Sequence, residues 1–157
     1  MGGSGSRLDK SLTLTYVDSG VLIFAAKGTT AAAALALPFL QDPNREFVTS
    51  DYVRLEVLPK AVWMHNEAEV EFYETFFRLN TRTIPTSVAL LEFAMDEACK
   101  IGLNAVDAIH IACAVFGGAE EIVTSEKPTK PMHRTGLVRV VSIFPNTDAP
   151  ANAGTGA

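Results

Sequence analysis

The sequence predicts an α/β protein, a three-layer α/β/α sandwich in which a parallel sheet carries helices on both faces. Short β-type segments alternate with longer segments of helical periodicity, in the order strand, helices, strand, helices, strand, helices, strand, loop, strand. The chain has 157 residues, of which 48% are hydrophobic and 20% charged, so it fits one domain with a sizeable core.

The first half of the sequence predicts two strands and four helices. The strands are residues 12–18 and 45–50, and the first of them alternates with period two. Ser19 is the expected N-cap of the first helix, and Gly28 its stop. The second helix should end near Pro38. The three helical segments after the first are 29–40, 51–64 and 66–79.

The second half predicts two strong helices and three strands. Pro85 demotes the first of these strands to a weak edge strand. An amphipathic helix, with Glu92 and Glu97 on its exposed face, closes at Gly102. The next helix is apolar on most of its sides, so it should be largely buried. The strands are 81–87, 120–125 and 136–144, and the helices are 87–102 and 104–116.

Charge and composition restrict the class of protein. The net charge of −5 and pI of about 5.1 argue against a broad basic face that coats a nucleic-acid duplex, but not against a nuclease. No apolar run is long enough to span a membrane. The two cysteines carry no metal-binding spacing, and a reducing cytoplasm is expected. We expect a flexible leader at 1–11, a domain at 12–144 and a disordered tail at 145–157.

Four acidic residues stand at strand ends or in the helix turns that follow strands. Asp18 closes the first strand, Glu126 follows the fourth, and Glu56 and Asp107 lie near the starts of helices. Sites in parallel α/β sheets form beyond the carboxyl ends of the strands. Carboxylates held close together repel one another unless a cation lies between them, and Mg²⁺ or Mn²⁺ prefers such oxygen ligands. The four acids therefore predict a metal site able to activate water for phosphate hydrolysis.

Each acid also has a structural alternative. Asp107 comes three residues after Asn104 and could complete a capping box at the start of its helix. Asp18 could be only a cap or turn residue, Glu56 a solvated helix residue and Glu126 a loop residue. One site would explain all four positions at once, which favours the metal hypothesis.

These motifs resemble those of PIN-domain ribonucleases, and most closely the VapC-type toxins of bacterial toxin–antitoxin pairs. The matching stretches are YVDSGVLIFA, TSDYVRLEVL, LNAVDAIHIACA and IVTSEK, and the resemblance covers about residues 12–143. It implies a five-stranded parallel sheet in the order 3-2-1-4-5. It also implies that Asp18, Glu56, Asp107 and Glu126 are catalytic and bind Mg²⁺ or Mn²⁺ to cleave RNA phosphodiesters.

The fourth acid departs from the pattern of this family, which usually has aspartate there. Glu126 is one methylene longer, so its oxygens reach further and are less fixed. Asp18, Glu56 and Asp107 could still hold a single metal ion, so the number of metal positions stays open.

Other polar residues are candidates for contacts with substrate. Ser19 and Ser125 each adjoin one of the acids, and Arg54 and Lys127 could hold RNA phosphates. Capping serines and solvated surface charges are the alternatives. His110 lies one turn after Asp107 and could ligate metal or relay a proton, although a satisfied core histidine is the simpler interpretation.

The sequence thus favours a metal-dependent endoribonuclease, with a catalytically weak or inactive PIN-like RNA- or protein-binding module as the alternative. The resemblance implies two protein partners, a second copy in a homodimer and a cognate antitoxin. An aromatic stripe is by default part of the core, but any exposed part of it would mark an interface. The stripe consists of Trp63, Phe72, Phe76 and Phe77.

Overall fold

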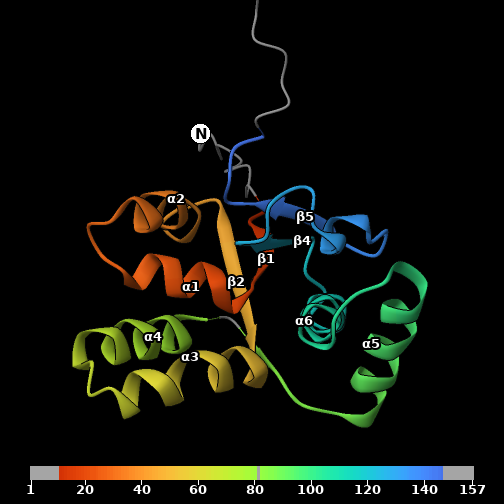
Figure 1. Cartoon of the computed structure of the whole chain (residues 1–157), viewed down its shortest axis with the longest axis horizontal. Coiled ribbons are helices and arrows are strands. Elements are labelled where there is room, and N and C mark those ends of the chain that lie inside the picture. Colours follow the sequence, from red (N-terminus) through yellow and green to blue (C-terminus); the bar gives the residue numbers. More distant parts are fainter. Residues whose placement is uncertain (1–10, 81, 147–157) are drawn as a thin grey trace, which may run out of the picture.

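A five-stranded parallel sheet stands between two layers of helices in the computed structural model, which describes residues 11–80 and 82–146 (Figure 1). The strand order is β3-β2-β1-β4-β5, and every neighbouring pair is parallel. The predicted fold class and sheet order are therefore confirmed. The strands are β1 (Thr13–Val17), β2 (Arg45–Ser50), β3 (Arg82–Ile84), β4 (Glu121–Thr124) and β5 (Arg139–Ser142).

Four helices cover one face of the sheet and two cover the other (Figure 1). The first group is α1 (Ser19–Ala26), α2 (Ala31–Leu40), α3 (Asp51–Trp63) and α4 (Glu67–Leu79). The second group is α5 (Val88–Ile101) and α6 (Ala105–Phe116). Helix α6 packs directly on β1, β2 and β4, and α5 packs on α6. Because α6 is enclosed in this way, six of its residues are buried, as its apolar sequence predicted. None of the described helices is by itself long and apolar enough to cross a membrane.

The core lies on both faces of the central strands. Tyr16, Leu22, Ile111 and Ile122 are fully buried and join β1, α1, α6 and β4. Cys113 of α6 belongs to this core, whereas Cys99 is exposed, and both are free thiols. The expected leader and tail fall mostly on residues 1–10 and 147–157, which lie outside the described residues, and the domain limits 12–144 stay a prediction.

Two helix boundaries differ from the sequence prediction. The N-cap of α1 is Asp18 rather than Ser19, since the Asp18 side chain accepts a hydrogen bond from the Val21 backbone N–H. Helix α2 does not end near Pro38 but continues to Leu40. Proline lacks only its own N–H donor, and so close to the C-terminal end of a helix one missing bond is tolerated. Helix α1 does stop near Gly28, which takes a left-handed backbone with φ +70.

Two side chains contradict the expected burial. Trp63 is 81% exposed, because it lies at the C-terminal end of α3, next to the exposed Val62 and Met64. Glu97 is buried rather than exposed, because the segment after β4 covers it and Thr135 donates a hydrogen bond of 3.0 Å to its carboxylate. That segment contains a short 3₁₀ helix, Pro131–Arg134, where the sequence predicted a loop.

A buried ion cluster ties four strands together at the start of β4. The carboxylate of Glu121 is fully buried and accepts hydrogen bonds from Arg45 of β2 and Arg139 of β5, both at 2.6 Å, and from Thr15 of β1 at 2.9 Å. Burial alone raises the pKa of Glu121, but these donors outweigh it and hold the pKa below its ordinary value. The cluster fixes the register of β1, β2, β4 and β5, and thereby the site at their carboxyl ends.

Candidate active site

Asp18 lies where β1 ends and α1 begins. Strands β1 and β4 are neighbours at the point where strand order reverses, and Val17 is in register with Val123. One oxygen of Asp18 accepts from the Val21 backbone N–H at 3.2 Å, and the other accepts from the Thr124 hydroxyl. Burial raises the pKa of Asp18, while the positive charge of His110 and these hydrogen bonds oppose that rise. Asp18 is therefore a rigidly held carboxylate at the switch point of the sheet.

Glu56 reaches the same region from α3. The Ser19 hydroxyl donates to one of its oxygens at 2.9 Å, and Nε2 of His110 lies 2.7 Å from the other. Burial by itself raises the pKa of Glu56, but the hydrogen bond and charge of His110, together with Ser19, bring it below its ordinary value. Glu56 is thus held ionised by its neighbours, between α1 and α6.

His110 belongs to a buried chain of hydrogen bonds. It is 2% exposed, its Nδ1 lies 2.8 Å from the Tyr16 hydroxyl, and that hydroxyl lies 2.8 Å from Oγ of Ser50. Ser50 in turn caps α3, the helix that carries Glu56. Both ring nitrogens of His110 are occupied, so the structure shows a histidine that holds Glu56.

Asp107 forms the helix cap that its position in the sequence allowed, and it also lies near other acids. Its backbone N–H donates to the Asn104 side chain at 2.9 Å, and its carboxylate accepts from the Asn104 amide at 3.1 Å, so it does belong to a helix cap. Its carboxylate also faces the other acids. Burial raises the pKa of Asp107, and the negative charges of Glu126 and Glu56 raise it further, against the lowering effect of His110.

Glu126 follows β4 on a tightly held backbone. Its N–H donates to the Thr124 hydroxyl at 3.0 Å, and its carbonyl accepts from Ser142 at 2.7 Å and from His133 at 3.2 Å. Its carboxylate lies close enough to Asp107 to raise the pKa of that acid. The turn therefore directs the charge of Glu126 towards the cleft.

The four candidate substrate-binding residues fall into two groups. Ser19 hydrogen-bonds Glu56, and the backbone of Ser125 hydrogen-bonds Asp18, so both serines lie at the acids. Arg54 lies elsewhere on α3. It pairs with Glu74 at 3.1 Å and lies over the Phe77 ring. Lys127 is exposed, and its backbone carbonyl accepts from the Lys130 N–H. The contacts of Arg54 and Lys127 within the described residues thus involve other partners than the four acids.

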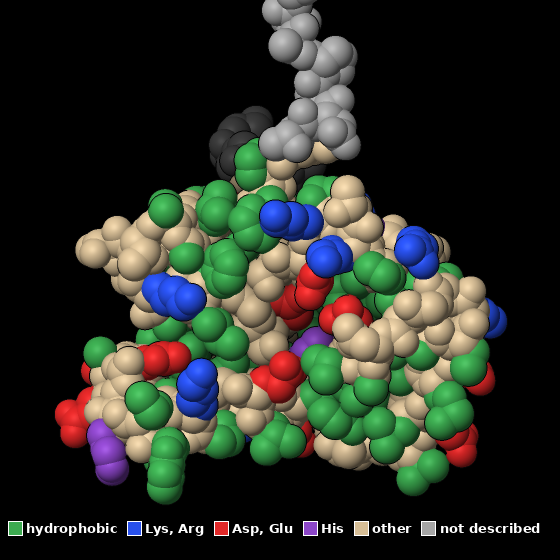
Figure 2. All heavy atoms as spheres, in the orientation of Figure 1, with side chains coloured by type: hydrophobic (Ala, Val, Ile, Leu, Met, Phe, Trp, Pro, Cys, Tyr) green, Lys and Arg blue, Asp and Glu red, His purple; other side chains and the backbone are tan. Residues whose placement is uncertain are grey.

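Acidic side chains and a histidine gather in a central hollow, between the surface over α1–α4 and the surface over α5 and α6 (Figure 2). The four acids named from the sequence thus lie at the same end of the sheet. Within the described residues, however, no three His, Cys, Asp or Glu side chains are already arranged to hold a metal ion. The arrangement is a cluster of repelling carboxylates, offset by one histidine and several hydroxyl groups.

Three supporting residues were missed by the sequence prediction. Thr124 and Tyr16 hold Asp18 and His110, and Gly20 lets Ser125 approach α1, since a Cβ at Gly20 would lie 1.9 Å from the Ser125 hydroxyl oxygen. Thr124 directly precedes Ser125, and Gly20 directly follows Ser19. This adjacency to candidate site residues is the sequence signal that could have identified them. Tyr16 offers no such signal, because a buried strand tyrosine looks like core.

The structure thus defines an α/β/α protein with a cluster of carboxylates beyond the carboxyl ends of β1 and β4. No family model matches the chain, and no curated relative matches it. Among solved structures, it is similar to a chain of VapBC2 from Rickettsia felis bound to a promoter DNA fragment, with 14% identity, a TM-score of 0.63 and coverage of 83% of this chain and 98% of that one.

Two further solved structures have the same fold. DNA-bound VapBC from Salmonella typhimurium matches at 17% identity and a TM-score of 0.63, covering 85% of this chain and 100% of that one. VapC20 from Mycobacterium tuberculosis, a toxin that cleaves the sarcin–ricin loop, matches at 19% identity and a TM-score of 0.59, with coverage of 80% and 98%. The chain therefore has the PIN-domain fold of VapC-type toxin structures, as the sequence motifs predicted.

Proposed function

We propose that this protein is a divalent-metal-dependent endoribonuclease and the toxin of a toxin–antitoxin pair. The observation that carries the proposal is the electrostatic coupling of the acids. The pKa of Asp107 is raised by burial and then by the charges of Glu126 and Glu56, which share one end of the sheet with Asp18. Such repulsion is unfavourable in a structural cap and useful in a cation site.

The chemistry of this donor set fits a hard cation. All four candidates are carboxylates, and Mg²⁺ and Mn²⁺ prefer oxygen ligands. Asp18, Glu56, Asp107 and Glu126 would hold the ion, and the two glutamates are long enough to move towards the fixed aspartates. When bound, the metal would supply an activated water and neutralise charge on the phosphate.

The residues of the chain would prepare the site for that chemistry. Thr124 and the Val21 backbone orient Asp18, so this carboxylate loses little freedom when it binds a cation. His110 and Ser19 hold Glu56 in the ionised form that a ligand requires. The enclosing surfaces on both sides of the hollow would limit access of solvent to the scissile phosphate.

Cleavage of a structured RNA under single-turnover conditions in Mn²⁺ tests the proposal. Asp18→Asn should abolish cleavage, because it removes a ligand charge and leaves the side-chain shape unchanged. Asp96→Asn, the same change at an exposed position of α5, is the matched control and should cleave as the parent does. Cleavage by Asp18→Asn at the parental rate would overturn the proposed site.

A melting experiment tests the metal separately from the RNA. Mn²⁺ should raise the melting temperature, since a ligand that binds only the folded state stabilises it by mass action. The double variant Asp18→Asn, Asp107→Asn should lose this response. A double variant that still responds as the parent does would show that the ion binds elsewhere.

One observation favours the alternative, a PIN-like module that binds RNA or protein without cleaving it. Glu56 is already satisfied by His110 and Ser19, and the described residues contain no complete ligand set for a metal. A parent protein that binds RNA, shows no thermal response to Mn²⁺ and cleaves nothing would support this alternative over the nuclease.

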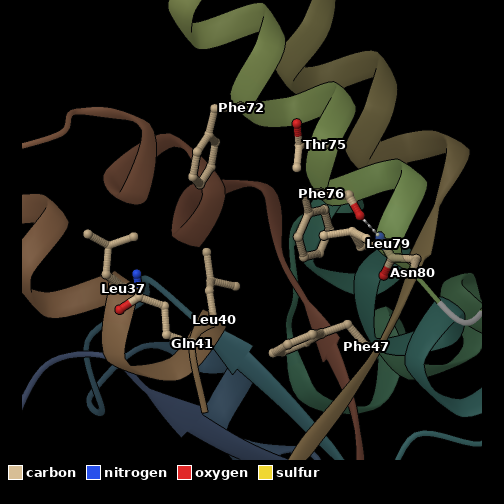
Figure 3. Close-up of a pocket in the computed structure, with 9 residues that line it drawn as sticks. All are labelled: Leu37, Leu40, Gln41, Phe47, Phe72, Thr75, Phe76, Leu79 and Asn80. Carbon is tan, nitrogen blue, oxygen red and sulfur yellow. Dashed lines mark hydrogen bonds between the residues drawn. The ribbon is translucent and has the colours of Figure 1, made fainter. Parts of the chain in front are cut away.

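The partner that we infer is a cognate antitoxin, and an apolar groove between α2 and α4 is its candidate binding surface. In Figure 3, Leu37 and Leu40 of α2 face Phe72 and Phe76 of α4 across a cavity of about 370 Å³, with Phe47 of β2 beneath them. Such a groove suits the apolar face of a partner helix. In co-expression with a candidate antitoxin, Leu37→Glu should release that partner from the complex.

The expected homodimer is a separate proposal. The exposed apolar end of α3, which includes Trp63, Val62 and Met64, provides apolar surface for such contacts. Light scattering should give twice the monomer mass. A monomer at high protein concentration would contradict the dimer without affecting the proposed nuclease.

A further inference from the structure

A second hollow opens beside the acids, between α1, α3 and α4. Its volume is about 330 Å³, within the range of small-molecule sites. Glu56 belongs both to its wall and to the acid cluster, so the hollow borders the acids. The hollow is lined by Ile23, Lys27, Glu56, Val57, Lys60, Ala61, Met64, Asn66, Glu69 and Tyr73.

The hollow leads outward from the acids along α3. Glu56, Lys60 and Met64 follow one another at four-residue intervals, so they share one face of the helix and its C-cap. At 1.5 Å per residue, Lys60 lies about 6 Å and Met64 about 12 Å along the axis from Glu56. On the facing helix, Lys27 follows Ile23 by the same interval. A chain that leaves the acids can therefore run between two lysines.

Neither Lys27 nor Lys60 forms an ion pair with any residue that the structure describes. Within residues 11–80 and 82–146, the ion pairs involve Arg45, Arg54, His110 and Arg139, and neither Lys27 nor Lys60. Lys27 lies 5.6 Å from the centre of the Phe24 ring, which orients it without cancelling its charge. Basic side chains also lie on the surface over α1 and α3 on this side of the acidic hollow (Figure 2).

In the outer wall, two neighbouring side chains hold the carboxylate of Glu69 in a fixed orientation. Asn66 caps α4 and donates its side-chain amide to Glu69 at 2.9 Å, and the buried Tyr73 donates its hydroxyl to the other oxygen of Glu69 at 2.5 Å. Both oxygens of the carboxylate are thereby oriented, and each keeps a second lone pair. The flexible Met64 side chain provides an apolar contact nearby.

We propose that this hollow is an RNA subsite that binds the nucleotide next to the phosphate held at the acids. This inference rests on the proposed ribonuclease function and adds its substrate recognition. Lys27 and Lys60 bind backbone phosphate, and Met64 packs against the base. The two oxygens of Glu69 accept from adjacent N–H donors, a pair that guanine presents at N1 and N2. The subsite therefore favours guanine.

Binding of labelled RNA separates this inference from cleavage. The probe is a fluorescein-labelled uridine nonamer with one central guanine, titrated against Asp18→Asn protein in Mg²⁺ so that the RNA stays intact. In that background, Lys27→Gln with Lys60→Gln should weaken binding at least about tenfold at 0.1 M salt. The slope of log K against log salt should fall by about 1.4, since each single-strand phosphate contact contributes roughly 0.7.

The matched control removes two exposed positive charges elsewhere, Arg78→Gln with Lys100→Gln, and should leave the affinity and slope unchanged. Replacing the guanine by inosine removes the N2 donor and should weaken binding to Asp18→Asn protein, but not to the same protein carrying Glu69→Gln. Lysine variants that bind like the control overturn the subsite. A base-independent Glu69→Gln effect overturns the role of Glu69.

The outcomes also separate the subsite from the proposed function. If the parent cleaves RNA and the lysine variants bind and cleave normally, the proposed nuclease function holds and the proposed subsite is wrong. If RNA binding depends on the two lysines but the parent never cleaves RNA in Mn²⁺, the proposed subsite holds and the proposed nuclease function is wrong. Lys27 and Lys60 are exposed, and melting temperatures within a few degrees of the parent will establish that the variants are folded.

Discussion

Gly20 offers a test of how closely the ends of β1 and β4 must approach. It is the second residue of α1 and directly follows two candidate site residues, Asp18 and Ser19. A Cβ built on Gly20 would lie 1.9 Å from the hydroxyl oxygen and 3.0 Å from the Cβ of Ser125. Gly20→Ala must therefore turn the Ser125 hydroxyl away and press on the Ser125 Cβ, next to Glu126.

Two opposing terms set the size of the effect. Alanine is better than glycine inside a helix by up to about 1 kcal/mol. Overpacking a close contact costs about 1–3 kcal/mol. Taking the middle of that range, Gly20→Ala should destabilise the parent by about 1 kcal/mol. With Ser125→Gly already present the contact is absent, so the same change should stabilise by up to about 1 kcal/mol, a coupling of about 2 kcal/mol.

Urea unfolding of the parent, both single variants and the double variant in EDTA measures this coupling. Gly136→Ala is the matched control, since a Cβ there meets nothing within 4 Å. It should change the free energy of unfolding equally with and without Ser125→Gly. A coupling between Gly20→Ala and Ser125→Gly below about 0.5 kcal/mol, the usual error of additivity, would refute the close approach.

Three further predictions concern charge and burial. Asp107→Asn should leave the metal-free protein as stable or more stable at pH 7, because the raised pKa of Asp107 reflects a charge that folding disfavours. This gain in stability should vanish as pH falls through about 4, where Asp107 is protonated in the unfolded chain as well. A loss of several kcal/mol in urea unfolding would make Asp107 purely structural. Glu121→Gln should cost about 2 kcal/mol at pH 7. Because folding lowers the pKa of Glu121, that stability is present above its unfolded pKa and should be lost as acid protonates it; an equal cost at pH 7 and pH 3 would contradict this. His110→Ala should weaken Mn²⁺ binding measured by calorimetry, and His110→Gln should restore part of it; unchanged Mn²⁺ affinity in both would show that His110 does not orient Glu56.

The sheet was predictable because its signals are local. Residues that favour strands mark the short β segments, with period-two alternation in the first, and Gly102 ends α5 as the sequence indicated. The strand order came from the resemblance and not from periodicity. The error in the N-cap of α1 arose because Asp18 and Ser19 are both good N-caps, and only the tertiary position of β4 selects Asp18.

The site was predictable in its residue types but not in its network. Acids at strand ends are visible in a sequence, since parallel strands bring their carboxyl ends together. The partners of those acids are not, because Thr124 is 106 residues from Asp18 and His110 is 54 residues from Glu56. The same distance hides the ion cluster at Glu121, whose Arg45 partner is 76 residues away.

The buried histidine explains how the chain tolerates its acids before any cation binds. A lone buried carboxylate is costly, and several together are worse. His110 counters this cost directly: its charge opposes the rise in pKa of Asp18 and Asp107, and its Nε2 contacts Glu56. A metal at the acids would therefore meet a Glu56 that His110 already holds ionised and oriented. The contact that stabilises the apo site thus also keeps Glu56 in the form that a metal ligand requires, so removing His110 should lower the affinity for metal.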